Sequence, residues 1–207
     1  MSLTSANVAT ASSCYTTYMA DRSNAKVIAI VGMSGAGKSA ATDYLTDKGY
    51  PKVNFVNVII DALREANLEP TLENEKMMRD KLRREEGNDV VVVRVVEQID
   101  RLIEAGQHRI IVDGMGAWLA YKVMKHEFPG QLTTIAITAP RRLRHRRLAT
   151  RPDRPLTTQE ADARDYDEIE TLNKGGVIAI ADYFVPNEGS IDDMHRQLEG
   201  ILAEVEF

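Results

Sequence analysis

Apolar and polar residues follow two different rhythms along the chain. Short unbroken apolar runs, such as Val-Ile-Ala-Ile-Val at 27–31, are typical of strands buried on both faces. Longer segments with apolar residues three or four positions apart are typical of helices. Strands are predicted at 27–31, 53–58, 109–112, 132–138 and 182–185, and helices at 38–47, 61–67, 72–86, 89–105, 118–128 and 191–205, with two polar helices flanking the break at 152–155. This alternation predicts an α/β fold in three layers, a five-stranded parallel sheet flanked by helices.

The segment 89–105 fits either kind of element. Its four valines at 90–93 favour a strand, whereas its length and the spacing of Val95, Ile99 and Ile103 favour a helix. We expect a helix, because a strand of this length would be unusual.

Length and composition narrow the classes of protein. A chain of 207 residues fits one α/β domain with insertions. A net charge of −5 argues against a nucleic-acid partner, which usually requires a basic face. Apolar runs stay short of the roughly 18 residues that a membrane span needs, so no membrane partner is expected. Cys14 is the single cysteine, which fits a reducing cytoplasm.

Residues 1–24 differ from the rest of the chain. They are rich in Ser, Thr and Ala, with neither the basic start nor the apolar core of a secretory signal. We therefore expect a Ser/Thr-rich N-terminal extension at 1–24 and one domain at 25–207.

The segment after the first predicted strand matches the phosphate-loop pattern G-x-x-x-x-G-K-[ST]. Glycines allow consecutive backbone N–H groups to point at phosphates, and the following helix adds its positive N-terminal end. In this pattern Lys38 reaches the β- and γ-phosphates, and the Ser39 hydroxyl can ligate Mg²⁺. We therefore expect a nucleoside triphosphate and Mg²⁺ as cofactors, with the nucleotide held by Gly32, Ser34, Gly35, Ala36, Gly37, Lys38, Ser39 and Ala40.

Asp113 follows the apolar run at 110–112. Ligands of open α/β sheets bind at the carboxyl ends of the strands, where a carboxylate can hold Mg²⁺ through water. The alternative is a simple Asp-Gly turn. Beside a phosphate loop we favour the metal role.

Residues 141–154 carry seven arginines and one acid. Guanidinium groups stabilise the charge that develops during phosphoryl transfer, which suits a lid over a triphosphate at 141–172. The alternative is a solvated helix paired with the acids that follow, and we expect both to hold for different arginines. The catalytic candidates are Arg147, Arg151 and Arg164.

Two further sites have structural alternatives. The loop 187–190 precedes a helix, so Ser190 could simply cap that helix. Asp61 could serve as the base for an acceptor hydroxyl, or it could complement the dipole of the helix that it begins.

Several blocks together resemble an uncharacterised, largely archaeal family of P-loop kinases related to dephospho-CoA kinase and adenylate kinase. The similarity covers the span from about 25 to 204. It is carried by residues 32–39, Leu68-Glu69-Pro70 with Asn74, Leu82–Gly87, Asp113-Gly114, the arginines at 144, 147 and 151, Arg164-Asp165, Val177–Tyr183 and Asn187–Ser190.

The resemblance implies a doubly wound sheet, an arginine lid, and a helical acceptor-binding segment at 57–87. It also implies that the loop 187–190, with Asn187 and Gly189, lies against the adenine ring. Relatives usually carry two acceptor-side arginines where this chain has Ile60 and Gly116. Arg64 or Arg79 could substitute for them; otherwise the acceptor is not an ordinary nucleoside monophosphate.

The function implied by these features is ATP- and Mg²⁺-dependent phosphoryl transfer to a small nucleotide-like acceptor. Among named activities, dephospho-CoA kinase follows most naturally from the resemblance. The alternative is a nucleotide-dependent switch or binding module with slow hydrolysis that needs no acceptor.

Overall fold

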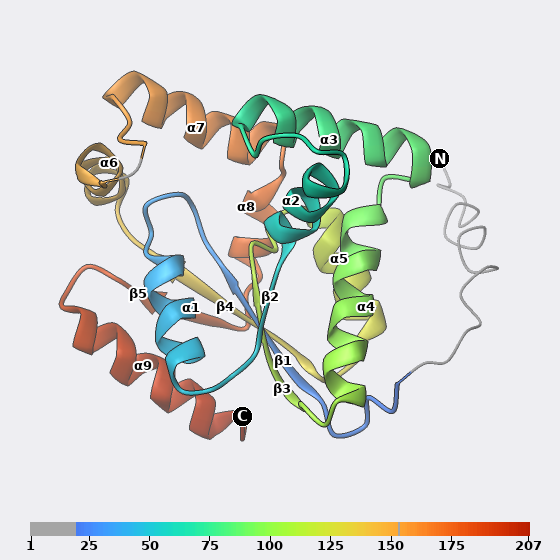
Figure 1. Cartoon of the computed structure of the whole chain (residues 1–207). Coiled ribbons are helices and arrows are strands. Elements are labelled where there is room, and N and C mark those ends of the chain that lie inside the picture. The colour runs from blue at the N-terminus through green and yellow to red at the C-terminus, as the bar shows by residue number, and fades with distance from the viewer. Residues whose placement is uncertain (1–19, 153) are drawn as a thin grey trace, which may run out of the picture.

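The computed structural model describes residues 20–152 and 154–207 (Figure 1). Its strands are β1 (Lys26–Val31), β2 (Lys52–Asn54), β3 (Arg109–Asp113), β4 (Leu132–Thr138) and β5 (Tyr183–Pro186). They form one five-stranded parallel sheet in the order β2-β3-β1-β4-β5. Because β3 and β4 pair with opposite sides of β1, the chain reverses its winding direction at β1. In such sheets the ligand crevice lies at the carboxyl ends of the strands at this point.

Helices cover both faces of the sheet, as Figure 1 shows. On one face lie α1 (Lys38–Asp47) and α9 (Ile191–Glu204), and on the other α4 (Val90–Glu104) and α5 (Trp118–Glu127). This arrangement confirms the predicted three-layer α/β fold with its parallel sheet.

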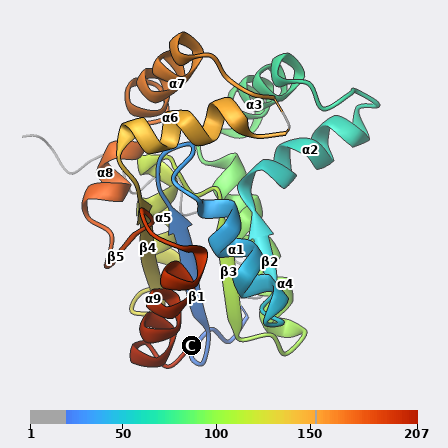
Figure 2. The same ribbon diagram turned by 90° about the vertical axis from the view of Figure 1, so that its left-hand side faces the viewer.

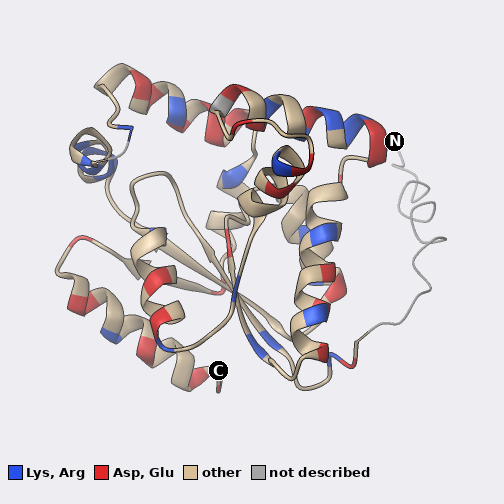
Figure 3. Ribbon diagram, viewed as in Figure 1, with Lys and Arg blue, Asp and Glu red and all other residues tan. Residues whose placement is uncertain are grey.

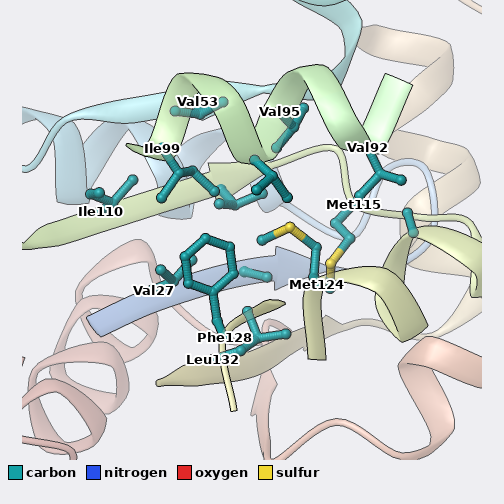
Figure 4. Packing of buried hydrophobic residues seen from close by; sticks show 14 of the residues in the cluster. Val27, Val53, Val92, Val95, Ile99, Ile110, Met115, Met124, Phe128 and Leu132 are labelled. Atoms are coloured by element: carbon teal, nitrogen blue, oxygen red, sulfur yellow. The ribbon is translucent and has the colours of Figure 1, made fainter. Parts of the chain in front are cut away.

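A large cluster of buried apolar side chains fills the core between the sheet and α4 and α5 (Figure 4). Phe128 and Ile99 are completely buried there, together with Val95. Burying each large apolar side chain stabilises the fold by about 1.5–3 kcal/mol. Residues 90–104 are helical, which confirms the helix predicted there, because the spacing of Val95, Ile99 and Ile103 directs one face at this core.

The second predicted strand, at 53–58, is wrong beyond Asn54. A helix, α2 (Phe55–Glu65), begins there instead, with the Asn54 side chain accepting a hydrogen bond from the Val56 N–H as its N-cap. The predicted helix at 61–67 therefore starts six residues too late. The apolar residues follow helical spacing, and those that α2 buries are Phe55, Val58, Ile59, Ala62 and Leu63.

The remaining helices lie over the carboxyl ends of the strands (Figure 2). They are α2, α3 (Leu72–Glu86), α6 (Arg141–Thr150), α7 (Thr158–Glu170) and α8 (Lys174–Ala179). The predicted 57–87 segment corresponds to α2 and α3, and the predicted lid at 141–172 to α6 and α7. Helix α8 was not among the predicted elements. These five helices thus lie over the end of the sheet where ligands of this fold bind.

The start of the described chain packs on the domain. Ala20 is buried, and Arg22 donates hydrogen bonds to Asp100 and Glu127 while its guanidinium lies over the ring of Phe128. The last residues of the predicted extension therefore contact the core, whereas residues 1–19, with Cys14, lie outside the described residues. Within the described ranges, no helix combines the length and the apolar character needed to cross a bilayer.

Candidate functional site

The phosphate loop joins the central strand to α1. Gly37 precedes α1 with φ +108°, a conformation that favours glycine, and a Cβ there would lie 2.1 Å from Nδ2 of Asn187. Among the described residues, no side chain caps the start of α1. The backbone N–H groups of its first turn therefore remain available to an anion at the carboxyl end of β1.

The first half of the loop is in close contact with the neighbouring backbone. A Cβ on Gly32 would lie 2.4 Å from the carbonyl oxygen of Ile137, and one on Gly35 would lie 2.6 Å from that of Arg144. Both glycines have positive φ, +144° and +77°. The sequence pattern therefore reflects two separate demands, backbone conformation and close approach to β4 and α6.

Lys38 is folded back on the loop, with Nζ donating to the carbonyl oxygen of Met33 at 3.1 Å. Burial, together with the positive charges of Lys174 and Arg164, lowers the pKa of its amine to about 8, against the opposing effect of Glu168 and Asp113. The amine therefore shares its surroundings with two other cations and two carboxylates. Such a group gains strongly from a phosphate that neutralises the excess positive charge.

Asp113 lies at the end of β3, level with Ile30 on β1 and Asn54 on β2. Asn54 Nδ2 donates to Asp113 Oδ2 at 3.0 Å, and burial raises the pKa of Asp113 above its ordinary value. Asn54 thus both caps α2 and orients Asp113, a role that sequence reasoning missed. The available signal in the sequence was Asn54 itself, a polar residue within the predicted strand at 53–58.

The Mg²⁺ prediction concerns Ser39 and Asp113. Ser39 is exposed on the first turn of α1, and its hydroxyl and the Asp113 carboxylate are oxygen donors of the kind that Mg²⁺ prefers. No group of three or more His, Cys, Asp or Glu side chains that could hold a metal occurs among the described residues. The residues present fit a cation bound jointly with substrate phosphates rather than by the protein alone.

The carboxylate of Glu168, on α7, lies in the phosphate loop. Glu168 is 1% exposed and accepts hydrogen bonds from the Ser34 N–H at 2.9 Å and the Ser34 hydroxyl at 2.7 Å. Lys174 Nζ donates to the same carboxylate at 2.8 Å, and Arg164 Nε lies 3.4 Å from it. Burial alone would raise the pKa of Glu168, but Lys174 and Ser34 lower it to about 2.

Lys174, the first residue of α8, reaches this point across Gly116. A Cβ on Gly116 would lie 2.5 Å from Cε of Lys174. The position where the resemblance led us to expect an arginine is therefore filled by the stem of a lysine from another element. A cavity of about 20 Å³ beside it is lined by Ile30, Val31, Gly32, Lys38, Gly114, Met115, Gly116 and Lys174.

This cavity is far smaller than the roughly 300–1,000 Å³ of typical ligand pockets. The cavity therefore has no room for a nucleotide while Glu168 and Lys174 are placed as they are. Glu168 and Lys174 were both missed as site residues from the sequence. The i, i+4 pair of Arg164 and Glu168 was a local signal, but it predicts only a helix-surface ion pair.

The basic segment expected to form a lid includes α6, whose ribbon is blue at its Lys and Arg positions in Figure 3. Its arginines separate into buried and exposed ones. Arg144 is buried, donates to the Ser34 carbonyl oxygen at 3.0 Å, and pairs with Asp165 of α7 at 2.7 and 2.8 Å. Arg142 and Arg146 are exposed. Arg144 thus fits the pairing with the following acids that was considered from sequence, and the role over a triphosphate stays a prediction.

The three predicted catalytic arginines lie at different places. Arg147 donates to the carbonyl oxygens of Ala36 and Asn187, at 3.4 and 2.9 Å, behind the loop. Arg151 donates to the carbonyl oxygen of Arg154, and Arg164 lies beside Glu168. The structure thus brings Arg147 and Arg164 to the loop, whereas the hydrogen bond of Arg151 is local to the turn after α6.

The loop after β5 is tied to the phosphate loop. Asn187 is buried and its Nδ2 donates to the Ala36 carbonyl oxygen at 2.8 Å, while Gly189 is exposed. Ser190 caps α9 through a capping box with Asp193, the alternative considered from sequence. Asn187 therefore connects this loop to the loop at 32–39.

Asp61 lies on α2, half exposed and paired with Arg64 at 2.6 Å. It lines a separate cavity of about 230 Å³ between α2 and α4, together with Val58, Ala62, Glu65, Arg94, Glu97, Gln98 and Arg101. Ile60 is on the same helix and half-buried. The structure does not bring Asp61 together with the residues of the phosphate loop.

Solved structures of similar fold include TT1252 from Thermus thermophilus, with a TM-score of 0.60 at 21% identity over 87% of this chain and 97% of that one. Shikimate kinase from Bacteroides thetaiotaomicron matches with a TM-score of 0.54 at 15% identity, over 86% and 98%. Dephospho-CoA kinase from Campylobacter jejuni matches with 0.51 at 14%, over 88% and 98%. At these identities the likeness establishes the P-loop kinase-like fold.

Sequence relatives and a family model identify the chain more closely. It is 29% identical over 182 residues to a UPF0200 protein of Thermococcus kodakarensis, covering 86% of this chain and 97% of that protein. It is 31% identical over 185 residues to a UPF0200 protein of Sulfurisphaera tokodaii, covering 87% and 97%. The model described as "AAA domain" matches residues 28–173, from β1 to the start of α8. The chain is therefore a member of the UPF0200 family, built on an AAA-type P-loop domain with a kinase-like fold.

Proposed function

We propose that this protein transfers a phosphoryl group from Mg·ATP to a small nucleotide-like acceptor. The observation that carries the proposal is the start of α1. It lies uncapped by any described side chain at the carboxyl end of the central strand, with Lys38 in its first position. Backbone N–H groups and a lysine arranged in this way bind the phosphates of a nucleoside triphosphate.

The phosphate loop supplies the donor side of the reaction. Backbone N–H groups between Gly35 and Ala40 would hold the β-phosphate, and Lys38 would bridge the β- and γ-phosphates. Ser39 and Asp113, the latter oriented by Asn54, would hold Mg²⁺, which would neutralise charge on the phosphates. These residues do no covalent chemistry; they position and stabilise the group that is transferred.

The lid arginines stabilise the charge that develops on the transferring group. Arg147 and Arg164 are already beside the loop, and Arg151 would reach it when α6 and α7 close around the nucleotide. Asn187 and Gly189 would lie beside the adenine ring. Asp61 serves as the acceptor base only if α2 moves, since it faces another cavity here.

Dephospho-CoA kinase activity is the specific assignment that we propose to test first. The structural likeness to the dephospho-CoA kinase from Campylobacter jejuni supports it at the level of the fold. Ile60 and Gly116, in place of the expected acceptor-side arginines, favour an acceptor other than an ordinary nucleoside monophosphate.

A nucleotide-dependent switch is the second candidate. The same two replacements favour it, and so does Glu168, which occupies part of the loop and gives the protein two states for a nucleotide to select between. A switch would hydrolyse ATP slowly without an acceptor and would bind a partner in one nucleotide state.

An acceptor screen separates the two functions. The protein is incubated with Mg·ATP and dephospho-CoA, nucleosides or nucleoside monophosphates, and ADP formation is followed. A kinase shows ADP formation that depends on one acceptor and falls by orders of magnitude in Lys38→Ala. ADP formation at one slow rate with every acceptor and with none would favour the switch, and a rate unaffected by Lys38→Ala would remove the loop from the mechanism.

A further inference from the structure

The environment of the Glu168 carboxylate has the chemistry of a phosphate site. Its donors are a backbone N–H and hydroxyl from the phosphate loop and the ammonium of Lys174, with the guanidinium of Arg164 at 3.4 Å. Backbone N–H groups combined with Lys and Arg are the usual ligands of phosphate oxygens. A carboxylate is the anion that a protein side chain can place among them.

The local backbone accommodates Lys174 at this position. Its stem passes over Gly116, where even a methyl group would come within 2.5 Å of Cε. From there its ammonium meets Glu168, while its stem and Lys38 line the same small cavity. Two lysines therefore approach the end of the loop from different elements, one from α1 and one from α8.

The ion pairs formed by Glu168 are an inefficient way of stabilising the fold. Removing charged groups from water costs free energy that their attraction often does no more than offset, and an apolar contact of similar volume would serve as well or better. The loop N–H and the two cations around Glu168 are therefore better suited to a site where the Glu168 carboxylate can be replaced by an anionic ligand.

Resting on the proposed function, we propose that Ser34, Lys174 and Arg164 form the subsite for the transferring phosphoryl group, and that Glu168 occupies this subsite until the third phosphate of ATP displaces it. The Lys174 ammonium then donates its hydrogen bond to that phosphate instead of to Glu168. Glu168 acts as an internal competitor that opposes binding of a triphosphate and leaves the subsite of the β-phosphate, at the first turn of α1, accessible.

The proposal predicts selective effects on nucleotide binding. Removing the competing charge with Glu168→Gln should strengthen binding of a non-hydrolysable ATP analogue at least about tenfold and leave ADP affinity nearly unchanged. Lys174→Met should weaken binding of the analogue by about tenfold or more, again with little effect on ADP. Lys174→Arg, which keeps the charge, should retain most of the affinity for the analogue.

The test is isothermal titration of ADP and of the ATP analogue, each with Mg²⁺, into the full chain. Glu170→Gln is the matched control, because it removes an acid from the exposed side of the same helix and should change neither affinity. Lys174→Met leaves the buried Glu168 with fewer hydrogen-bond donors and could unfold the protein for that reason alone. The double variant Glu168→Gln/Lys174→Met tests the loss of Lys174 without this unpaired acid. It should bind ADP normally and show less gain for the analogue than Glu168→Gln alone.

The outcomes distinguish this proposal from the proposed function. Equal changes for ADP and the analogue in the variants, or no change for either, would overturn the subsite while leaving a nucleotide-binding loop intact. Selective changes in a protein that never phosphorylates an acceptor would support the subsite and overturn kinase activity. Absence of nucleotide binding in both the wild type and Glu168→Gln would overturn both proposals.

Discussion

The buried carboxylate of Glu168 makes stability depend on pH in a way that can be calculated. Its pKa is lowered from 4.5 to about 2 by Lys174 and Ser34, against the effect of burial, which raises it. Because the folded-state pKa is the lower one, this stabilisation is complete well above pH 4.5 and is lost as the pH falls towards 2. The full difference corresponds to about 3 kcal/mol, of which about 1 kcal/mol should be lost by pH 3.5.

Glu168→Gln removes this titration. The difference in free energy of unfolding between wild type and Glu168→Gln, measured with urea and no nucleotide, should shrink by about 1 kcal/mol between pH 7 and pH 3.5. Glu170→Gln, which replaces an exposed acid of the same helix, is the matched control. A difference for Glu168→Gln that stays constant over the same range would refute the reasoning.

Three other predictions concern the loop and its supports. Because the pKa of Lys38 is about 8 and phosphate binds its charged form, ATP affinity should fall about tenfold between pH 7 and pH 9 in calorimetric titrations, but not in Lys38→Arg. Arg144→Ala leaves the buried Asp165 without its main partner and should lower the free energy of unfolding by about 3–5 kcal/mol. The exposed Arg142→Ala should lower it by about 0.5 kcal/mol or less. Similar losses in the two variants would contradict the importance of the buried pair. Gly37→Ala should abolish nucleotide binding, because the added Cβ would lie 2.1 Å from Nδ2 of Asn187. Gly49→Ala, also at positive φ but in open space, should bind nucleotide normally. Equal effects of the two substitutions would mean that backbone strain alone matters.

The sequence was sufficient for the parallel sheet, apart from the bounds of its second strand, and for the phosphate loop, because both depend on local patterns. Residues 27–31 and 38–47 have the strand and helix rhythms themselves, and the loop between them has its glycines where the backbone requires positive φ. The strand prediction at 53–58 failed beyond Asn54 because six residues are too few to show a clear period. The capping contact of Asn54, one residue before the helix, decided its structure.

The rest of the site depends on contacts between distant residues. Ser34 and Glu168 are 134 positions apart, and no periodicity connects them. Gly116 was interpreted as the absence of an arginine, but the structure shows the stem of Lys174 in that space. The function of a glycine that makes room for another chain segment becomes visible only when that segment is placed.

The fate of the third phosphate of ATP tests the central claim most directly. With Mg·ATP and the acceptor identified by the screen, phosphorus NMR can follow whether the γ-phosphate becomes bonded to the acceptor, as an ester of a hydroxyl or an anhydride of a phosphate, or becomes inorganic phosphate. Phosphoryl transfer predicts a new signal of the phosphorylated acceptor that grows in step with ADP and is lost in Lys38→Ala. Growth of inorganic phosphate alone, at the same rate with and without acceptor, would contradict it.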